Sequence, residues 1–293
     1  MKYFNSILVA NRGEIACRVI RTAKQLGYRT IAVYSDADAG APHVHLADDA
    51  VRIGPGPVGE SYLNPNLILQ AATASGAESI HPGYGFLSEN AAFAGAVENA
   101  GLVFIGPTRE AIDVMGNKAE SKRRMIEAGV PCVPGYEGHD QSDKVLLAEG
   151  SKIDLPLMVK AAAGGGGRGM RLVHDRAELG NAIKLARAEA EGAFGSGELI
   201  LEKAIIKPRH VEIQIFADTL GNIVHLGERD CSVQRRHQKV VEEAPCPIMT
   251  SALREKMGKS AIAAAQSVNY RGAGTVEFLL DESGSFYFLE MNT

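Results

Sequence analysis

The chain has 293 residues, of which 45% are hydrophobic and 23% charged, and its formal net charge is −4. This balance is typical of a folded globular protein and excludes a disordered or collagen-like chain. The small negative charge excludes a global basic field for nucleic acid or an anionic membrane, and no apolar run has the length of a transmembrane helix. The N-terminus enters an apolar strand within seven residues, which leaves no room for a signal or transit peptide, so we expect a cytoplasmic protein.

Four cysteines are scattered along the chain without C-x-x-C spacing: Cys17, Cys132, Cys231 and Cys246. This spacing argues against a zinc site and against a disulfide framework. We therefore expect free thiols in a reducing compartment.

The first 110 residues alternate between expected strands and helices. Strands are predicted at residues 6–10, 30–34, 78–80 and 102–105, and helices at 14–26, 65–75 and 91–99. Strand-helix-strand order predicts a parallel sheet of the Rossmann-like type. The turn-dense segment HPGYGFLSEN, residues 81–90, follows a strand, where loops of such sheets often have functional roles. A simple Pro-Gly turn is the alternative.

The rest of the chain shows a different pattern. A connecting helix at 119–128 leads to strands at 155–163, 170–173 and 198–202 and a helix at 176–191, which together predict a small α+β module. From His210 onward, alternating segments separated by turns predict antiparallel hairpins, interrupted by a helix at 251–269. The predicted division is an α/β domain at 1–114, a linker helix at 115–134, a small module at 135–203 and an antiparallel-sheet domain at 204–293.

Residues 164–169 read GGGGRG, which has the spacing of a dinucleotide-binding loop but precedes a strand instead of a helix. A Walker A loop is excluded as well, because no Lys-Ser/Thr follows. Several glycines let backbone N–H groups converge on phosphate oxygens, and Lys160 on the preceding strand can reach the same anion. We interpret the segment as a phosphate-binding hairpin tip, with a flexible surface loop as the alternative.

Glu202 and Lys203 end a strand just before a predicted domain junction. Backbone groups at such a junction can bind the edge of an adenine base. The alternative is an exposed charged pair.

Acidic residues within two apolar strands near the C-terminus indicate a metal site. Glu277 lies in TVEFLL, and Glu290 and Asn292 lie in FLEMN. If the strands pair, the carboxylates face one side and offer the hard oxygen ligands that suit Mg²⁺. Burial of unpaired acids is costly, which favours a metal, and an internal salt bridge is the main alternative.

A dense group of cations lies in RDCSVQRRHQKVVEEAP, residues 229–245. It contains Arg235, Arg236, His237 and Lys239, with Glu242 and Glu243 as candidate counter-charges. We interpret it as a site for an anionic substrate, and a solvated basic face is the alternative. The acidic total charge and the lack of interleaved aromatic residues argue against nucleic acid.

Taken together, these motifs resemble the biotin carboxylases of the ATP-grasp superfamily. The resemblance spans all 293 residues through NRGEIACRVIRT, HPGYGFLSEN, MGNKAESK, AAAGGGGRGM, EKAIIKPRHVEIQ, RRHQKVVEEAP, YRGAGTVEF and FLEMNT. HPGYGFLSEN and RRHQKVVEEAP distinguish this family from other ATP-grasp ligases. The resemblance implies an ATP-grasp fold, α/β and α+β, with an N-terminal Rossmann-like domain, a small lid domain and a C-terminal antiparallel-sheet domain.

The resemblance also implies roles for individual residues. It implies that Lys118 and Lys160 contact the ATP phosphates and that the glycine loop of the lid consists of Gly164, Gly165, Gly166, Gly167 and Gly169. It further implies that Glu202 and Lys203 lie at the adenine base and that His210 and Gln234 contact the ribose or another part of the nucleotide. It assigns Mg²⁺, or Mn²⁺, to Glu277 and Glu290 with Asn292 close by, and the active-site cations to His237 and Lys239, the latter near bicarbonate.

The implied reaction has two stages. Bicarbonate attacks the γ-phosphorus of MgATP, giving carboxyphosphate and ADP, and the carboxyl group then passes to biotin on a carrier domain. The implied partners are the biotin carboxyl carrier domain, a carboxyltransferase subunit and a second copy in a homodimer. The segments GYEGHDQS and PLMVKAAAGGGG resemble acyl-CoA carboxylase α subunits more than acetyl-CoA or pyruvate enzymes.

The sequence departs from the family at its end. In the family, MNT is followed by an Arg, a Gln and a Glu that bind bicarbonate and supply the base, and a later Arg faces biotin. The sequence stops at Thr293, so we expect an N-terminal portion with an incomplete last domain that binds MgATP without carboxylating biotin efficiently. The alternatives are another ATP-grasp ligase, of carbamoyl-phosphate or purine metabolism, or a non-catalytic nucleotide-binding module.

Overall fold

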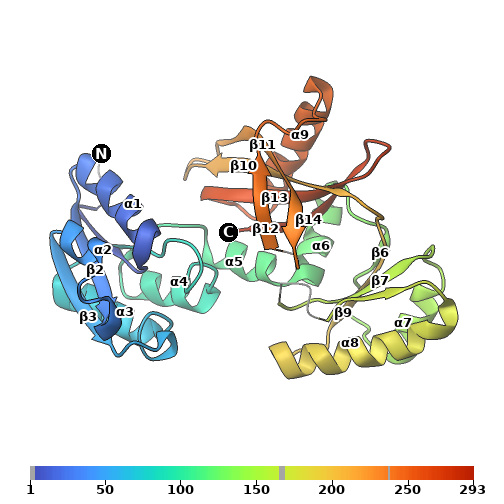
Figure 1. The fold of residues 1–293 in the computed structure, drawn as a ribbon, viewed down its shortest axis with the longest axis horizontal. Helices are drawn as coiled ribbons and strands as arrows, with labels where there is room; N and C mark the ends of the chain where they lie inside the picture. The colour runs from blue at the N-terminus through green and yellow to red at the C-terminus, as the bar shows by residue number, and fades with distance from the viewer. Residues whose placement is uncertain (1–3, 165–168, 237) are drawn as a thin grey trace. The chain divides into compact units, whose positions relative to one another are not determined.

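The computed structural model describes residues 4–164, 169–236 and 238–293. The chain divides into two compact units, one ending at Asp113 and the other running from Val114 to Asn292 (Figure 1). No helix within the described ranges is long and apolar enough to cross a membrane. The finer division predicted at residues 134 and 203 stays a prediction.

The first unit is built on a parallel sheet of order β3-β2-β1-β4-β5. Its elements, in chain order, are β1 (Ser6–Val9), α1 (Gly13–Gln25), β2 (Arg29–Ser35), α2 (Pro42–Leu46), β3 (Asp49–Gly54), α3 (Pro65–Ser75), β4 (Ser79–His81), α4 (Ala91–Asn99) and β5 (Val103–Phe104), followed by α5 (Arg109–Gly116) across the boundary. The predicted parallel sheet is confirmed, while α2, β3 and α5 were not predicted.

Helices cover both faces of this sheet because β1 presents alternate side chains to opposite sides. Ile7 and Val9 pack with the buried residues of α1, whereas Leu8 packs in the cluster formed with α3 and α4. β1 lies between β2 and β4, so the loops after β1 and β4 meet at the switch point of the sheet. There the side-chain amide of Asn11 donates hydrogen bonds to the carbonyls of Pro82 and Tyr84, both at 2.8 Å.

The second unit contains two antiparallel sheets. The small sheet has the order β6-β9-β7-β8 and the large sheet the order β12-β11-β10-β13-β14. The elements are α6 (Lys118–Glu127), β6 (Gly135–Tyr136), α7 (Asp143–Gly150), β7 (Leu157–Ala161), β8 (Arg171–Val173), α8 (Leu179–Phe194), β9 (Leu199–Lys203), β10 (Arg209–Ala217), β11 (Ile223–Arg235), β12 (Gln238–Glu243), α9 (Ser251–Ser267), β13 (Gly272–Leu280) and β14 (Phe286–Asn292). The predicted antiparallel hairpins and the mixed α/β and α+β class are confirmed.

Each sheet of this unit turns one apolar face toward a helix. In the small sheet, Val159 and Leu201 pack with Ile183 of α8, which lies along that face (Figure 1). In the large sheet, the side of β10 that contains Val211 and Ile213 is fully buried, and α9 packs against β10 and β11. Because side chains alternate along a strand, the polar residues of β10 point to the opposite face of the large sheet.

Candidate functional site

Three carboxylates form one row across neighbouring strands on the polar face of the large sheet. Glu212 on β10 lies directly opposite Glu277 on β13, and Glu277 lies directly opposite Glu290 on β14. Like charges at opposed positions repel, and the first two of these residues are buried. A buried row of this kind requires cations close by.

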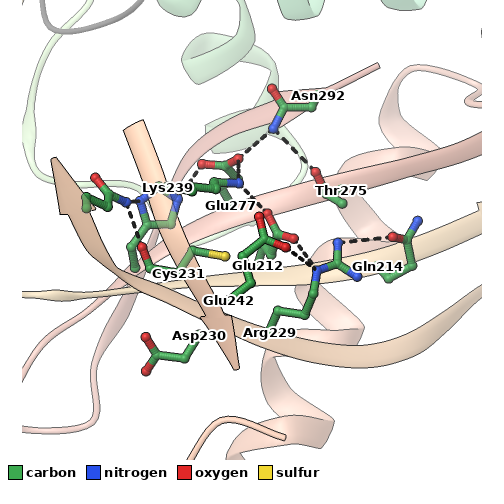
Figure 2. Close-up of polar contacts among 12 residues, drawn as sticks. Glu212, Gln214, Arg229, Asp230, Cys231, Lys239, Glu242, Thr275, Glu277 and Asn292 are labelled. Carbon is green, nitrogen blue, oxygen red and sulfur yellow. Dashed lines mark hydrogen bonds and ion pairs between the residues drawn. The ribbon is translucent and has the colours of Figure 1, made fainter. Parts of the chain in front are cut away.

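Lys239 and Arg229 supply this compensation (Figure 2). The Nζ atom of Lys239 contacts Glu212 and lies 2.6 Å from Oε1 of Glu277, while Arg229 contacts Glu212 from the neighbouring strand. Nε2 of His210 contacts the other oxygen of Glu277. Burial alone would raise the pKa of Glu277, but hydrogen bonds from His210 and Lys239 lower it to about 2. Burial opposes the charge of Lys239 as well, and the two carboxylates nevertheless raise its pKa.

A second row of neutral polar groups lies beside the carboxylates. Gln214, Thr275 and Asn292 occupy opposed positions on β10, β13 and β14. The amide of Asn292 donates to Oε1 of Glu277 at 2.6 Å, and Gln214 Oε1 accepts from Arg229 Nη2 at 3.1 Å (Figure 2). These amides fix the orientation of charged groups that would otherwise have several partners within reach.

Lys118, at the start of α6, joins this row to the glycine loop. Its Nζ lies 3.5 Å from Oε2 of Glu290, whose side chain is 36% exposed, and it donates to the carbonyl of Gly164. Gly164 has a φ of +82°, and a Cβ placed there would lie 2.2 Å from the ring of Phe194. Both observations require glycine at the first position of the loop.

A separate buried cluster lies between α6 and the small sheet. Glu202 on β9 is held between two lysines, with Lys160 Nζ at 2.5 Å from Oε2 and Lys122 Nζ at 3.0 Å from Oε1. Burial would raise the pKa of Glu202, but the charges of Lys160 and Lys122 lower it to about 2. Glu202 is therefore a buried, ionised residue and not half of an exposed charged pair.

The structure brings most of the predicted residues together. On or beside the polar face of the large sheet lie His210, Gln234, Lys239, Glu277, Glu290, Asn292, Lys118 and Gly164, and Gln234 Nε2 lies 2.7 Å from Nδ1 of His210. Lys160 and Glu202 meet in the second cluster. Lys203 lies apart, exposed, with Nζ at 3.3 Å from Asp154.

Some predicted residues fall elsewhere. Gly169 has a φ of +68°, and its carbonyl accepts a hydrogen bond from the amide of Ala161 at 3.1 Å. His237, Gly165, Gly166 and Gly167 lie outside the described residues. Among the described residues, the ion-pair partners of Lys239 are Glu212 and Glu277, while Glu242, one of the two predicted counter-charges of this segment, lies 3.8 Å from Nε of Arg229. The functional roles of the predicted residues stay predictions.

Sequence reasoning missed Glu212, Arg229 and Lys122. Glu212 lies in VEIQIFAD, two residues after His210, so period-two alternation along the strand places both side chains on one face. This alternation is the sequence signal that identifies Glu212. Lys122 lies within MGNKAESK, but α6 looks like an exposed helix from its sequence, and nothing local predicts the burial of this lysine.

The donor set around Glu277, Glu290 and Asn292 fits a hard divalent cation, because it offers oxygen ligands on adjacent strand positions. Both oxygens of Glu277 also contact protein groups, so the internal salt bridge considered as the alternative is present as well. A second group, Glu212, Cys231 and Glu242, has its candidate ligand atoms within 4.8 Å of one another. It fits a metal less well, since burial raises the pKa of Cys231 to about 12 and Glu212 already contacts two cations.

Family models match nearly the whole chain. Residues 3–112 match the biotin carboxylase N-terminal domain, and residues 117–293 match the ATP binding domain of the carbamoyl-phosphate synthase L chain. The methylcrotonoyl-CoA carboxylase subunit alpha of Dictyostelium discoideum is 55% identical over 293 residues, which are 100% of this chain and 42% of that protein. The biotin carboxylase of Nostoc sp. is 55% identical over 290 residues, which are 99% of this chain and 65% of that protein.

Solved structures show the same likeness. A biotin carboxylase from Campylobacter jejuni, crystallised as a β-γ-ATP complex, has a TM-score of 0.94 and 46% identity, covering 99% of this chain and 65% of that chain. The biotin carboxylase domain of the Hydrogenobacter thermophilus 2-oxoglutarate carboxylase, in complex with MgADP, ADP and bicarbonate, has a TM-score of 0.93 and 49% identity, covering 100% of this chain and 64% of that chain. The chain thus spans from two fifths to about two thirds of the length of these relatives. With both family models matched and the fold shared, the chain belongs to the biotin carboxylase family of ATP-grasp proteins.

Proposed function

We propose that this chain binds MgATP and forms the nucleotide-binding part of a biotin carboxylase that works in a biotin-dependent acyl-CoA carboxylase. The position of Lys118 is the observation that supports this most directly. Its ammonium group contacts the carbonyl of Gly164 and lies 3.5 Å from Glu290, so one cation joins the glycine loop to the acidic row. A positive charge that contacts both Gly164 and Glu290 supports a site for phosphate and a metal ion at this position.

In this proposal the nucleotide phosphates are bound by Lys118 and Lys160 with the glycine loop. Glu277, Glu290 and Asn292 hold the magnesium ion, which supplies neutralising charge at the phosphates. Phosphoryl transfer depends mainly on positioning and charge neutralisation, and these side chains provide both.

The proposed reaction begins with attack of bicarbonate on the γ-phosphorus of ATP, which gives carboxyphosphate and ADP. The carboxyl group then passes to N1′ of biotin held by a carrier domain, with release of phosphate and of the N1′ proton. The carboxylated biotin is the substrate of a carboxyltransferase subunit. Lys239, with His237 from the same segment, orients the bicarbonate anion. Glu212 and Glu277 keep the Lys239 ammonium charged, because their hydrogen bonds raise its pKa.

One observation favours a second candidate. The model matched by residues 117–293 is named for carbamoyl-phosphate synthase, another ATP-dependent enzyme. The match of residues 3–112 to the biotin carboxylase N-terminal domain favours the main proposal over this one. Bicarbonate-dependent ADP formation that free biotin stimulates would separate the two, measured in a protein that spans the full length of the biotin carboxylase relatives.

Binding of MgATP is the test suited to this chain. In isothermal titration calorimetry, we expect Lys118→Met to weaken MgATP about tenfold or more, because a charge-assisted contact to phosphate is lost. Glu290→Gln should weaken binding mainly in the presence of magnesium. Lys152→Met removes an exposed lysine that pairs with Glu149 and should bind as the wild type does. An unchanged affinity in both site variants would contradict the proposal, as would a wild-type chain that binds no MgATP.

A further inference from the structure

Lys122 is a buried cation to which the proposed function gives no role. It lies on α6, one turn after Lys118, and its side chain is only 6% exposed. Its Nζ is 3.0 Å from Oε1 of Glu202 and 3.3 Å from Oε2 of Glu137. A buried ammonium is retained at a cost in solvation, so its partners determine what it does.

The partner that matters is Glu202, which Lys122 shares with Lys160. The two lysines bind different oxygens of the same carboxylate, Lys122 from α6 and Lys160 from β7. If Lys160 turns toward a phosphate, Glu202 still has a cation at 3.0 Å. Without Lys122, the same movement would leave Glu202 buried and unpaired, which is strongly unfavourable.

Glu137 completes the charge balance of the cluster. Its Oε2 is a buried atom without a hydrogen bond among the described residues, and the ammonium of Lys122 is the cation that faces it. Two lysines thus stand against two glutamates, and the cluster is neutral while Lys160 remains in it. The thiol of Cys132 adds no charge, because burial raises its pKa to about 12.

We propose that Lys122 is a positioning residue for the nucleotide: by holding Glu202, it lets Lys160 leave that carboxylate and bind phosphate. This inference rests on the proposed function, since it assigns to Lys122 the control of a phosphate contact. Lys122 does not touch the nucleotide in this account. Its effect appears only with ligands that have phosphates.

The test compares ATP with adenosine in the Lys122→Met variant, by calorimetric titration of the whole chain. ATP affinity should fall about tenfold relative to wild type, while adenosine affinity, measured by competition, should change less than about twofold. A purely structural role would weaken both ligands equally. Lys152→Met, at an exposed position, is the matched control for the type of substitution.

A second variant covers the case in which Lys122→Met fails to fold. Lys122→Met/Glu137→Gln removes one cation and one anion, so the remaining pair of Lys160 and Glu202 is neutral. This variant should unfold within a few degrees of the wild type, yet bind ATP about tenfold more weakly with unchanged adenosine affinity. An ATP to adenosine affinity ratio equal to that of the wild type would overturn the inference. Absence of ATP binding in the wild type would overturn the proposed function instead.

Discussion

Two buried carboxylates of the second unit, Glu202 and Glu277, have the same pKa of about 2 in different surroundings. Glu202 is held between the lysines of α6 and β7 in a closed cluster. Glu277 is held by Lys239, His210 and an amide, and it borders Glu290 at the open end of its row. A lowered pKa by itself therefore does not separate a supporting ion pair from a ligand site. The difference lies in the neighbouring groups and in access to solvent.

Acidification should break both clusters and have the largest effect. Both carboxyls have folded-state pKa values near 2, below their ordinary value of 4.5. Their contribution to the free energy of unfolding is therefore complete above about pH 4.5 and is lost as the pH falls toward 2. The loss is on the order of 3 kcal/mol for each carboxylate. Thermal unfolding followed by circular dichroism should show a steep decline of the Tm as the pH falls below about 4.5. A Tm that stays level down to pH 3 would contradict this.

Glu202→Gln should be the most destabilising single change of the two clusters. It leaves two buried lysines against Glu137 alone, and loss of one partner of a buried ion pair costs about 3–5 kcal/mol. The Tm should fall by roughly 10 °C. Glu255→Gln, at an exposed helix position paired with Lys259, is the control and should shift the Tm by less than about 2 °C. The expectation fails if the two variants unfold at similar temperatures.

Glu277→Gln should destabilise less than Glu202→Gln, by about 2–3 kcal/mol, and should affect ligands more. Lys239 keeps its contact with Glu212, so its ammonium is not left alone. We expect MgATP affinity to fall several-fold while ATP affinity without magnesium changes little, in titrations at two magnesium concentrations. A Tm loss as large as that of Glu202→Gln, with unchanged MgATP binding, would show that both clusters only support the fold.

The sequence predicted the sheets and much of the site, for reasons that are local. Period-two alternation in TVEFLL and SFYFLEMN predicts a hairpin, and the structure pairs Glu277 with Glu290 as that hairpin requires. By contrast, β3 reads DAVRIG, with charged residues at Asp49 and Arg52, and lacks a clear alternation. Helix α7 was not predicted either, because its main sequence signal is a single N-cap residue, Ser142, whose side chain accepts a hydrogen bond from the amide of Val145.

The remaining features depend on contacts between distant parts of the chain. Lys122 is buried because Glu202, eighty residues later, lies against α6. The requirement for glycine at position 164 comes from the ring of Phe194 at the end of α8. Neither neighbour can be deduced from local periodicity, since each depends on how the small sheet packs against its helices.

The strands that position the site differ in how firmly they are held, because β10 is central in the large sheet and β12 lies at its edge. Every residue of β10 is paired with β13, and β11 pairs on its other side, so its amides exchange with solvent only when the sheet itself separates. Lys239 belongs to β12, at the edge of the sheet, where fraying requires far less energy. Fraying of this edge would separate the ammonium of Lys239 from Glu212 and Glu277, while Glu212 keeps its place on β10 and its contact with Arg229.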